Sequence, residues 1–130
     1  MKNPFRPGDV LMYETTVTEA KLARFEGEVV HPVYGTFALG QDAEWACRQF
    51  VLAMREPEEE GIGTYLTIEH LSPAPLGASV RIEAELAAVE GHEVRCVYRA
   101  YWGNVLIARG KQHQKILLRT RLQARLHGPG

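Results

Sequence analysis

Apolar residues between positions 39 and 55 repeat with the period of one helix face. They fall at i, i+4, i+7, i+8, i+11, i+12 and i+15, and they are Leu39, Ala43, Ala46, Cys47, Phe50, Val51 and Met54. Each such side chain stabilises the folded state by roughly 1–3 kcal/mol on burial, before conformational entropy is subtracted. The spacing therefore predicts a helix over 39–55 whose apolar face forms the centre of the core.

Two features of this helix differ from a face that is simply buried or simply solvated. Glu44 lies at the edge of the apolar stripe beside Val51, so we expect its carboxylate to be partly desolvated. Trp45 and Leu52 lie close together on the opposite face. We therefore expect a second surface to cover that side of the helix.

Beyond Gly63 the hydrophobic period changes from 3.6 to 2, which predicts strands. The predicted strands span 64–71, 78–90, 92–102 and 105–118, and β-branched and aromatic residues predict another at 10–18. In the strand over 64–71, His70 shares the apolar face with Leu66 and Ile68. The pattern indicates an α+β fold, an antiparallel meander around one long helix.

The remaining segments are less regular. Residues 19–30 are charged and fit either a short helix or a flap, and residues 31–35 (HPVYG) are typical of a turn. The glutamate-rich residues 56–61 predict a solvated loop that ends the helix. In the tail over 118–130, leucines and arginines alternate at helical spacing, which predicts a short amphipathic helix.

Composition is typical of one globular domain over residues 1–130, with 45% hydrophobic and 24% charged residues. Cys47 and Cys96 form neither a CxxC motif nor a disulfide framework, which favours the reducing cytoplasm. The sequence has no 18-residue apolar run and no signal-peptide pattern, so we expect neither a membrane span nor export. The arginines of the tail are too weak a signal to predict nucleic-acid binding.

The absence of common motifs narrows the chemistry. There is no P-loop, GxGxxG, HExxH, GxSxG or paired CxxC, which removes the commonest nucleotide, zinc and serine-hydrolase sites. Thr36, Glu44 and His70 remain as polar residues in apolar settings. Each has a structural alternative, as a helix cap, a surface carboxylate and a satisfied imidazole. Together, however, a hydroxyl, a carboxylate and an imidazole are the groups that attack or hydrate an acyl carbonyl.

Cys47 is a rival nucleophile because it lies one turn beyond Glu44. Its position on the buried stripe favours an inert thiol.

Two segments carry a family resemblance. VYGTFALGQDAEWAC (33–47) and GTYLTIEHLSPAPLG (63–77) resemble the branch of hot-dog thioesterases that includes the fluoroacetyl-CoA thioesterase. The resemblance runs from about Thr36 to Leu117 and also fits the N-terminal strand. It implies the hot-dog fold, in which an antiparallel β-sheet wraps around one long central helix.

The resemblance also implies a site and a reaction. The catalytic threonine, glutamate and histidine of that branch fall on Thr36, Glu44 and His70, with separations of 8 and 26 residues. Its glycine beside the bound thioester falls on Gly63. The implied reaction is hydrolysis of a small or medium acyl-CoA to a carboxylate and free CoA, with no metal and no cofactor beyond the CoA of the substrate. The implied assembly is a homodimer, or a dimer of dimers, with sites made by both chains.

Several alternatives stay open at this point. A hot-dog enoyl-CoA hydratase or a non-catalytic acyl-CoA-binding module would carry similar residues, and either Thr36 or Glu44 fits the role of nucleophile. The fluoroacetyl-specific enzyme has a phenylalanine six residues before its catalytic threonine, where this chain has Val30, so we do not expect activity specific to fluoroacetyl-CoA. Candidates for binding the CoA phosphates, with surface solubility as their alternative role, are Arg99, Arg109 and Lys111.

Overall fold

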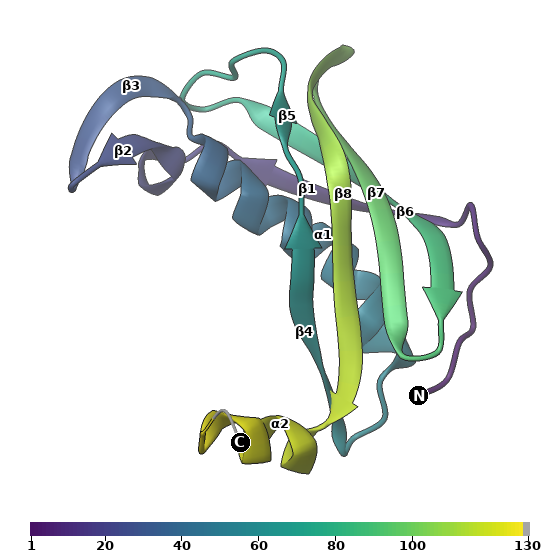
Figure 1. The fold of residues 1–130 in the computed structure, drawn as a ribbon. Coiled ribbons are helices and arrows are strands. Elements are labelled where there is room, and N and C mark those ends of the chain that lie inside the picture. The colour runs from purple at the N-terminus through teal and green to yellow at the C-terminus, as the bar shows by residue number, and fades with distance from the viewer. Residues whose placement is uncertain (129–130) are drawn as a thin grey trace.

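The computed structural model describes residues 1–128 and places one helix in the hollow of a curled antiparallel sheet (Figure 1). The helix is α1 (Thr36–Met54). The sheet comprises β1 (Val10–Thr16), β4 (Glu59–Leu66), β5 (Glu69–His70), β6 (Ser79–Glu90), β7 (Glu93–Trp102) and β8 (Val105–Leu118). Their order is β1-β6-β7-β8-β4, with the short β5 also paired to β8. This is the predicted α+β arrangement.

The core forms between the apolar stripe of α1 and the concave face of the sheet. All seven stripe residues named above are at most 1% exposed. The inward residues of β6 are also fully buried, and they are Val80, Ile82, Ala84 and Leu86. Trp102 continues the alternation of the inward residues of β7 but is 41% exposed, because it lies at the turn into β8.

Residues 19–34 form a hairpin that the sequence did not predict. A 3₁₀ turn, η1 (Glu19–Lys21), leads into β2 (Leu22–Phe25), which pairs with β3 (Glu28–Tyr34). The prediction of a turn over 31–35 is therefore wrong, because those residues lie mainly in β3 and bond to β2. The hairpin projects beyond the N-terminal end of α1 (Figure 1).

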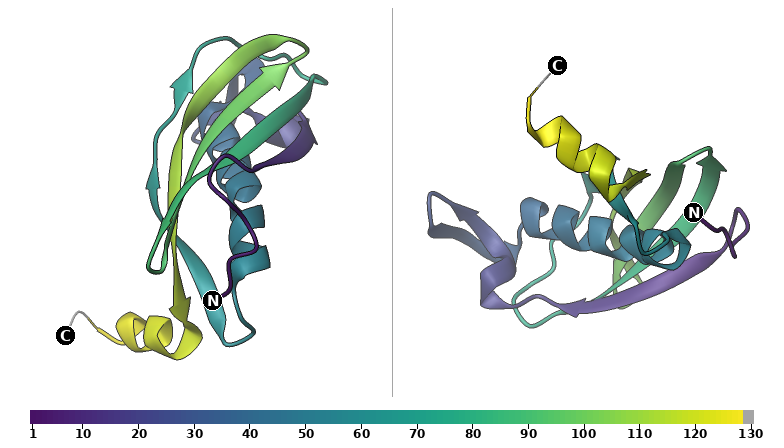
Figure 2. Two further views of the ribbon diagram at one scale, coloured as in Figure 1. Left: turned by 90° about the vertical axis from the view of Figure 1, so that its right-hand side faces the viewer. Right: turned by 90° about the horizontal axis from the view of Figure 1, so that it is seen from below.

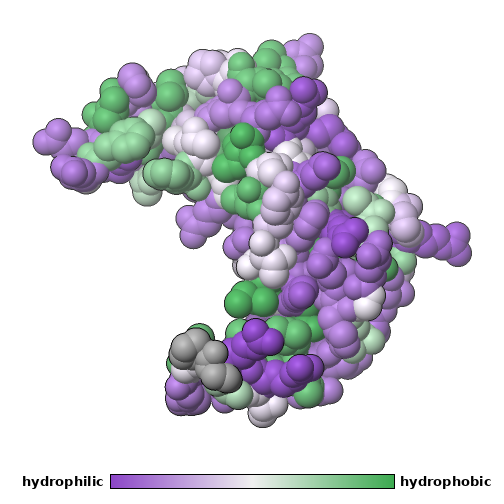
Figure 3. Space-filling view, in the orientation of Figure 1, coloured by the Kyte–Doolittle hydropathy of each residue, from purple (hydrophilic) through white to green (hydrophobic). Residues whose placement is uncertain are grey.

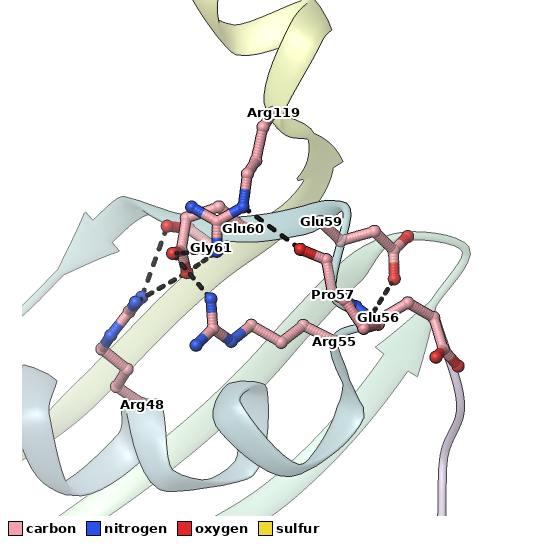
Figure 4. Close-up of polar contacts among 8 residues, drawn as sticks. All are labelled: Arg48, Arg55, Glu56, Pro57, Glu59, Glu60, Gly61 and Arg119. Atoms are coloured by element: carbon pink, nitrogen blue, oxygen red, sulfur yellow. Dashed lines mark hydrogen bonds and ion pairs between the residues drawn. The ribbon is translucent and has the colours of Figure 1, made fainter.

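The prediction of a solvated loop over 56–61 is wrong in its second half. β4 begins at Glu59, whose carboxylate pairs with the N-terminal ammonium at 2.9 Å. Glu60 pairs with Arg48 at 2.7 Å, with Arg55 at 2.8 Å and with Arg119 at 3.3 Å (Figure 4). These cations neutralise Glu59 and Glu60, so the two residues can form the start of β4 rather than remain in a solvated loop.

The chain ends in α2 (Arg119–Leu126), which confirms the predicted C-terminal helix; residues 129 and 130 of that predicted tail lie outside the described residues. α2 stands away from the body of the molecule, and Leu126 is 77% exposed (Figure 2). A hollow opens between α2 and the β2–β3 hairpin (Figure 3).

Trp45 is 45% exposed, so no part of the described chain supplies the cover predicted for that face of α1. No helix in residues 1–128 is long and apolar enough to cross a bilayer.

Candidate active site

Thr36 is the first residue of α1 rather than its cap. The helix begins three residues earlier than predicted, and Gly35 occupies the N-cap position without a side-chain hydrogen bond. The Thr36 hydroxyl lies instead 3.0 Å from Nδ1 of His70. The structural alternative of a capping threonine is therefore wrong, and the hydroxyl is directed at the candidate imidazole.

The turn into α1 is held by a network around Asp42, which is 9% exposed. The Lys21 ammonium donates to Asp42 Oδ2 at 3.0 Å, and the Tyr34 hydroxyl donates to the same oxygen. The backbone N–H of Gly35 also donates to the Lys21 carbonyl at 2.8 Å. Burial and then the Asp42 carboxylate raise the pKa of Tyr34, so its hydroxyl remains a donor. These contacts fix the backbone immediately before Thr36.

A break between β4 and β5 directs His70 toward Thr36. The sequence predicted one strand over 64–71, but its pairing with β8 is interrupted around Thr67. There the Thr67 carbonyl accepts a hydrogen bond of 2.6 Å from the Tyr98 hydroxyl. Gly110 makes this approach possible, because a Cβ at that position would overlap the Thr67 carbonyl. The irregularity re-aims the end of the strand, which a regular alternation of residues could not reveal.

The imidazole of His70 is half-buried and its chemistry is set by that burial. Desolvation lowers its pKa below the ordinary 6.5, against an opposing backbone hydrogen bond at Ser72. His70 is therefore neutral at pH 7. Its Nε2 atom is buried and has no hydrogen-bond partner within residues 1–128. In the tautomer that carries its proton on Nε2, Nδ1 accepts the Thr36 proton, which is the arrangement of a nucleophile and its base.

Glu44 lies elsewhere in the same chain. It follows Thr36 by eight residues on α1, which places it about 12 Å further along the helix. Its side chain is exposed at the sheet edge, so the expected partial desolvation is wrong within a single chain. One carboxylate oxygen packs against Gly63 of β4, where any Cβ would overlap it. The structure thus joins Thr36 to His70 and Glu44 to Gly63, but it does not join the two pairs.

Two buried amides support Glu44, and sequence analysis missed both. Gln112 Nε2 donates to Glu44 Oε1 at 3.2 Å, and Gln114 Nε2 donates to Gln112 Oε1 at 2.9 Å. The two glutamines are 1% and 2% exposed. Because Gln114 donates to the Gln112 oxygen, the Gln112 amide nitrogen is left facing Glu44. The available signal was the occurrence of two amides at inward positions of a predicted strand.

Two clefts meet at the Thr36–His70 pair. The larger, of about 520 Å³, lies beneath the β2–β3 hairpin. The smaller, of about 330 Å³, is shallower and is bounded by Leu71, Ser72 and Pro73. Val33, Thr36 and His70 line both clefts, so a ligand in either one contacts the pair.

The other candidates are less suited to chemistry. Cys47 is fully buried, and the neighbouring Cys96 together with burial raises the pKa of its thiol, as expected for an inert cysteine. Arg99 is paired with Glu83 and Glu85, and Arg109 is paired with Glu69. Lys111 is exposed on β8. Within residues 1–128 no three His, Cys, Asp or Glu side chains are grouped to bind a metal ion.

Comparison with known families identifies the family of the chain. Residues 17–120 match the family described as fluoroacetyl-CoA-specific thioesterase. The chain belongs to this thioesterase family. The matched range contains Thr36, Glu44, Gly63 and His70. The predicted thioester hydrolase is thereby confirmed.

Individual relatives extend this result. A fluoroacetyl-CoA thioesterase from Streptantibioticus cattleyicolor is 26% identical, over 97% of this chain and 95% of its own. The crystal structure of a thioesterase superfamily member from Thermus thermophilus matches with a TM-score of 0.90 and 36% identity, over 95% of this chain and 92% of that one. A hot-dog-like protein from Thermanaerovibrio acidaminovorans shares the fold, with a TM-score of 0.86 at 18% identity over 94% and 90% of the two chains. The predicted hot-dog fold is confirmed.

Proposed function

We propose that this thioesterase hydrolyses acyl-CoA to a carboxylate and free CoA at the Thr36–His70 pair. The observation that carries the proposal is the 3.0 Å contact between the Thr36 hydroxyl and Nδ1 of His70 at the meeting point of two clefts. A hydroxyl hydrogen-bonded to a base is the arrangement that attacks acyl carbonyls.

His70 Nδ1 takes the proton as Thr36 Oγ1 attacks the thioester carbonyl. Backbone N–H groups in the first turn of α1, which have no partner within the helix, stabilise the oxyanion. The C–S bond then breaks and the departing CoA thiolate takes the proton from His70. Water, deprotonated by Glu44, attacks the threonyl ester. Glu44 returns that proton to Thr36 Oγ1 as the ester C–O bond breaks, and the released carboxylic acid ionises in solvent. Gly63, against which the Glu44 carboxylate packs, lies beside the bound thioester in this proposal.

The proposed active form is a homodimer in which Glu44 of one subunit completes the Thr36–His70 pair of the other. The 12 Å offset along α1, about eight residues at 1.5 Å each, supports a site made by two chains. The exposed edge of β4 and the exposed Trp45 support a partner at this edge. Mixing inactive Thr36→Val and Glu44→Ala proteins should restore about a quarter of wild-type activity, because half the dimers are mixed and each has one intact site. No restoration after subunit exchange would contradict the shared site.

The test of the reaction is free CoA release from a panel of acetyl-, branched, aromatic and long-chain acyl-CoAs, read by chromatography so that Cys47 and Cys96 do not interfere with a thiol dye. Release well above the buffer rate is expected for at least one member.

We propose that the reaction needs no metal or added cofactor, so dialysis against EDTA should leave the rate unchanged. We also propose a cytoplasmic location, which two free buried cysteines support.

The same panel separates the two rival functions. An enoyl-CoA hydratase adds water to an enoyl-CoA without releasing CoA, and a binding module binds CoA without turnover and is indifferent to Glu44→Ala. CoA binding with no release from any member would favour the binding module.

A further inference from the structure

The carbonyl carbon of a thioester carries two substituents, the acyl chain and the pantetheine thiol, which extend to opposite sides of it and are called its two limbs below. The Thr36–His70 pair likewise separates two clefts, and Val33, Thr36 and His70 belong to the lining of both. A carbonyl held at the pair therefore sends one limb into each cleft. The lining of the clefts determines which limb each one accepts.

The larger cleft suits an apolar limb. Most of its wall is hydrocarbon, and the apolar side chains include those of Ala20, Leu22, Phe25, Phe37 and Ala38. Its polar side chains include those of Arg24, His31 and Gln41, and among the described residues no Asp or Glu lines it. Figure 3 shows apolar residues gathered on the hairpin above it.

Two aromatic side chains beside this cleft are unusually exposed. Phe25, on β2, is 61% exposed, and Phe37, directly after Thr36, is 81% exposed. Large apolar side chains left in solvent around a concave site mark a place where apolar ligand surface is buried. The smaller cleft is more open, and Ser72 gives its mainly apolar wall a hydroxyl that can bond an amide of pantetheine.

We propose that the cleft beneath the β2–β3 hairpin holds the acyl chain, and that the substrates are medium-length apolar acyl-CoAs rather than acetyl- or fluoroacetyl-CoA. This inference rests on the proposed function. A two-carbon acyl group would leave most of the 520 Å³ unfilled. Each added methylene that enters the cleft should raise kcat/KM by on the order of threefold to fourfold, until the cleft is full.

The experiment measures kcat/KM for acetyl-, butyryl-, hexanoyl-, octanoyl- and dodecanoyl-CoA with three proteins. These are the wild type, Ala20→Phe, which fills the cleft from an exposed position on η1, and Ala124→Phe, a matched change on the exposed surface of α2. In the wild type kcat/KM should rise from acetyl- to octanoyl-CoA. Ala20→Phe should lower the octanoyl-to-acetyl ratio of kcat/KM by about tenfold, as expected for the loss of two methylene contacts. Ala124→Phe should leave that ratio unchanged.

Three results would overturn the inference. A wild-type profile that is flat or highest for acetyl-CoA would leave the thioesterase reaction standing and reject the medium-chain preference. An equal rise in KM for every chain length in Ala20→Phe would assign the larger cleft to pantetheine instead. CoA release from no member of the series would reject the proposed function, and the acyl site with it.

Discussion

Thr36 Oγ1 and His70 Nδ1 lie 3.0 Å apart although 34 residues separate them in the sequence. The threonine is fixed by the backbone anchors of Gly35 and by the network around Asp42. The histidine is fixed by the interrupted pairing around Thr67. Both halves of the pair are therefore positioned by the fold itself, which is the condition for a preorganised site.

The pH dependence of the reaction should report His70. Its base form is the neutral imidazole, and burial lowers its pKa below the ordinary 6.5. Activity should therefore persist at pH 6.5 and fall only as the pH drops through this lowered pKa. The measurement is kcat/KM against pH for the best acyl-CoA. An acid limb centred above pH 6.5 would show that His70 is not the essential base.

Gly63→Ala should impair catalysis more than stability. The new Cβ would overlap Glu44 Oε1 and displace the carboxylate, and we expect kcat to fall by about 10- to 100-fold, as for a misplaced catalytic group. Thermal unfolding should change little because the overlapping atom is the far end of a flexible side chain. In a Glu44→Ala background the same substitution should cost nothing further in kcat. Additive losses would contradict a role through Glu44.

Gln112→Leu tests whether the buried amide orients Glu44. The substitution removes the donor to Glu44 Oε1 and replaces the amide with an apolar side chain of similar size. Loss of an orienting hydrogen bond to a charged group costs about 1.5–3 kcal/mol, so kcat should fall roughly 10- to 100-fold with KM little changed. Gln114→Leu is the matched control on the same face of β8, and it should have the smaller effect because it touches Glu44 only through Gln112. A Gln112→Leu protein that is less stable but keeps the wild-type kcat would mean that this glutamine serves only the fold.

Asp42→Ala should destabilise the protein. It leaves the Lys21 ammonium and the Tyr34 hydroxyl without their shared acceptor in a largely buried setting. Because Lys21 keeps some exposure to solvent, we expect the free energy of unfolding to fall by about 2–3 kcal/mol, below the full cost of an unpaired buried charge. Urea unfolding measures this change. A loss under about 0.5 kcal/mol would show that the network does not hold the turn before Thr36.

Much of the fold followed from hydrophobic periodicity. The stripe on α1 and the alternation on β6 each have one buried face, so the sequence pattern and the packing must agree. The hairpin over 22–34 was not predicted, because it covers little of the core and its exposed residues do not alternate strictly between apolar and polar. The entry of Glu59 and Glu60 into a strand was not predicted, because the cations that neutralise them come from distant parts of the chain.

The candidate site was predictable only in part. Thr36, Glu44 and His70 were identifiable as polar residues in apolar settings, and the family resemblance supplied their roles. Sequence could not show that Thr36 reaches His70, because that contact depends on the break at Thr67 and on Gly110. It also could not show that Glu44 lies two helical turns away and faces the open sheet edge.

The most direct measurement is the rate of free CoA release by Thr36→Val beside the wild type, on the best acyl-CoA of the panel and with folding of both proteins checked by circular dichroism. Valine keeps the shape of threonine but has no hydroxyl for His70 to activate. We expect kcat to fall by about 10²- to 10⁴-fold, with Thr36→Ser retaining most of the activity. A Thr36→Val enzyme that releases CoA within threefold of the wild-type rate would show that the Thr36–His70 pair does not carry out the hydrolysis.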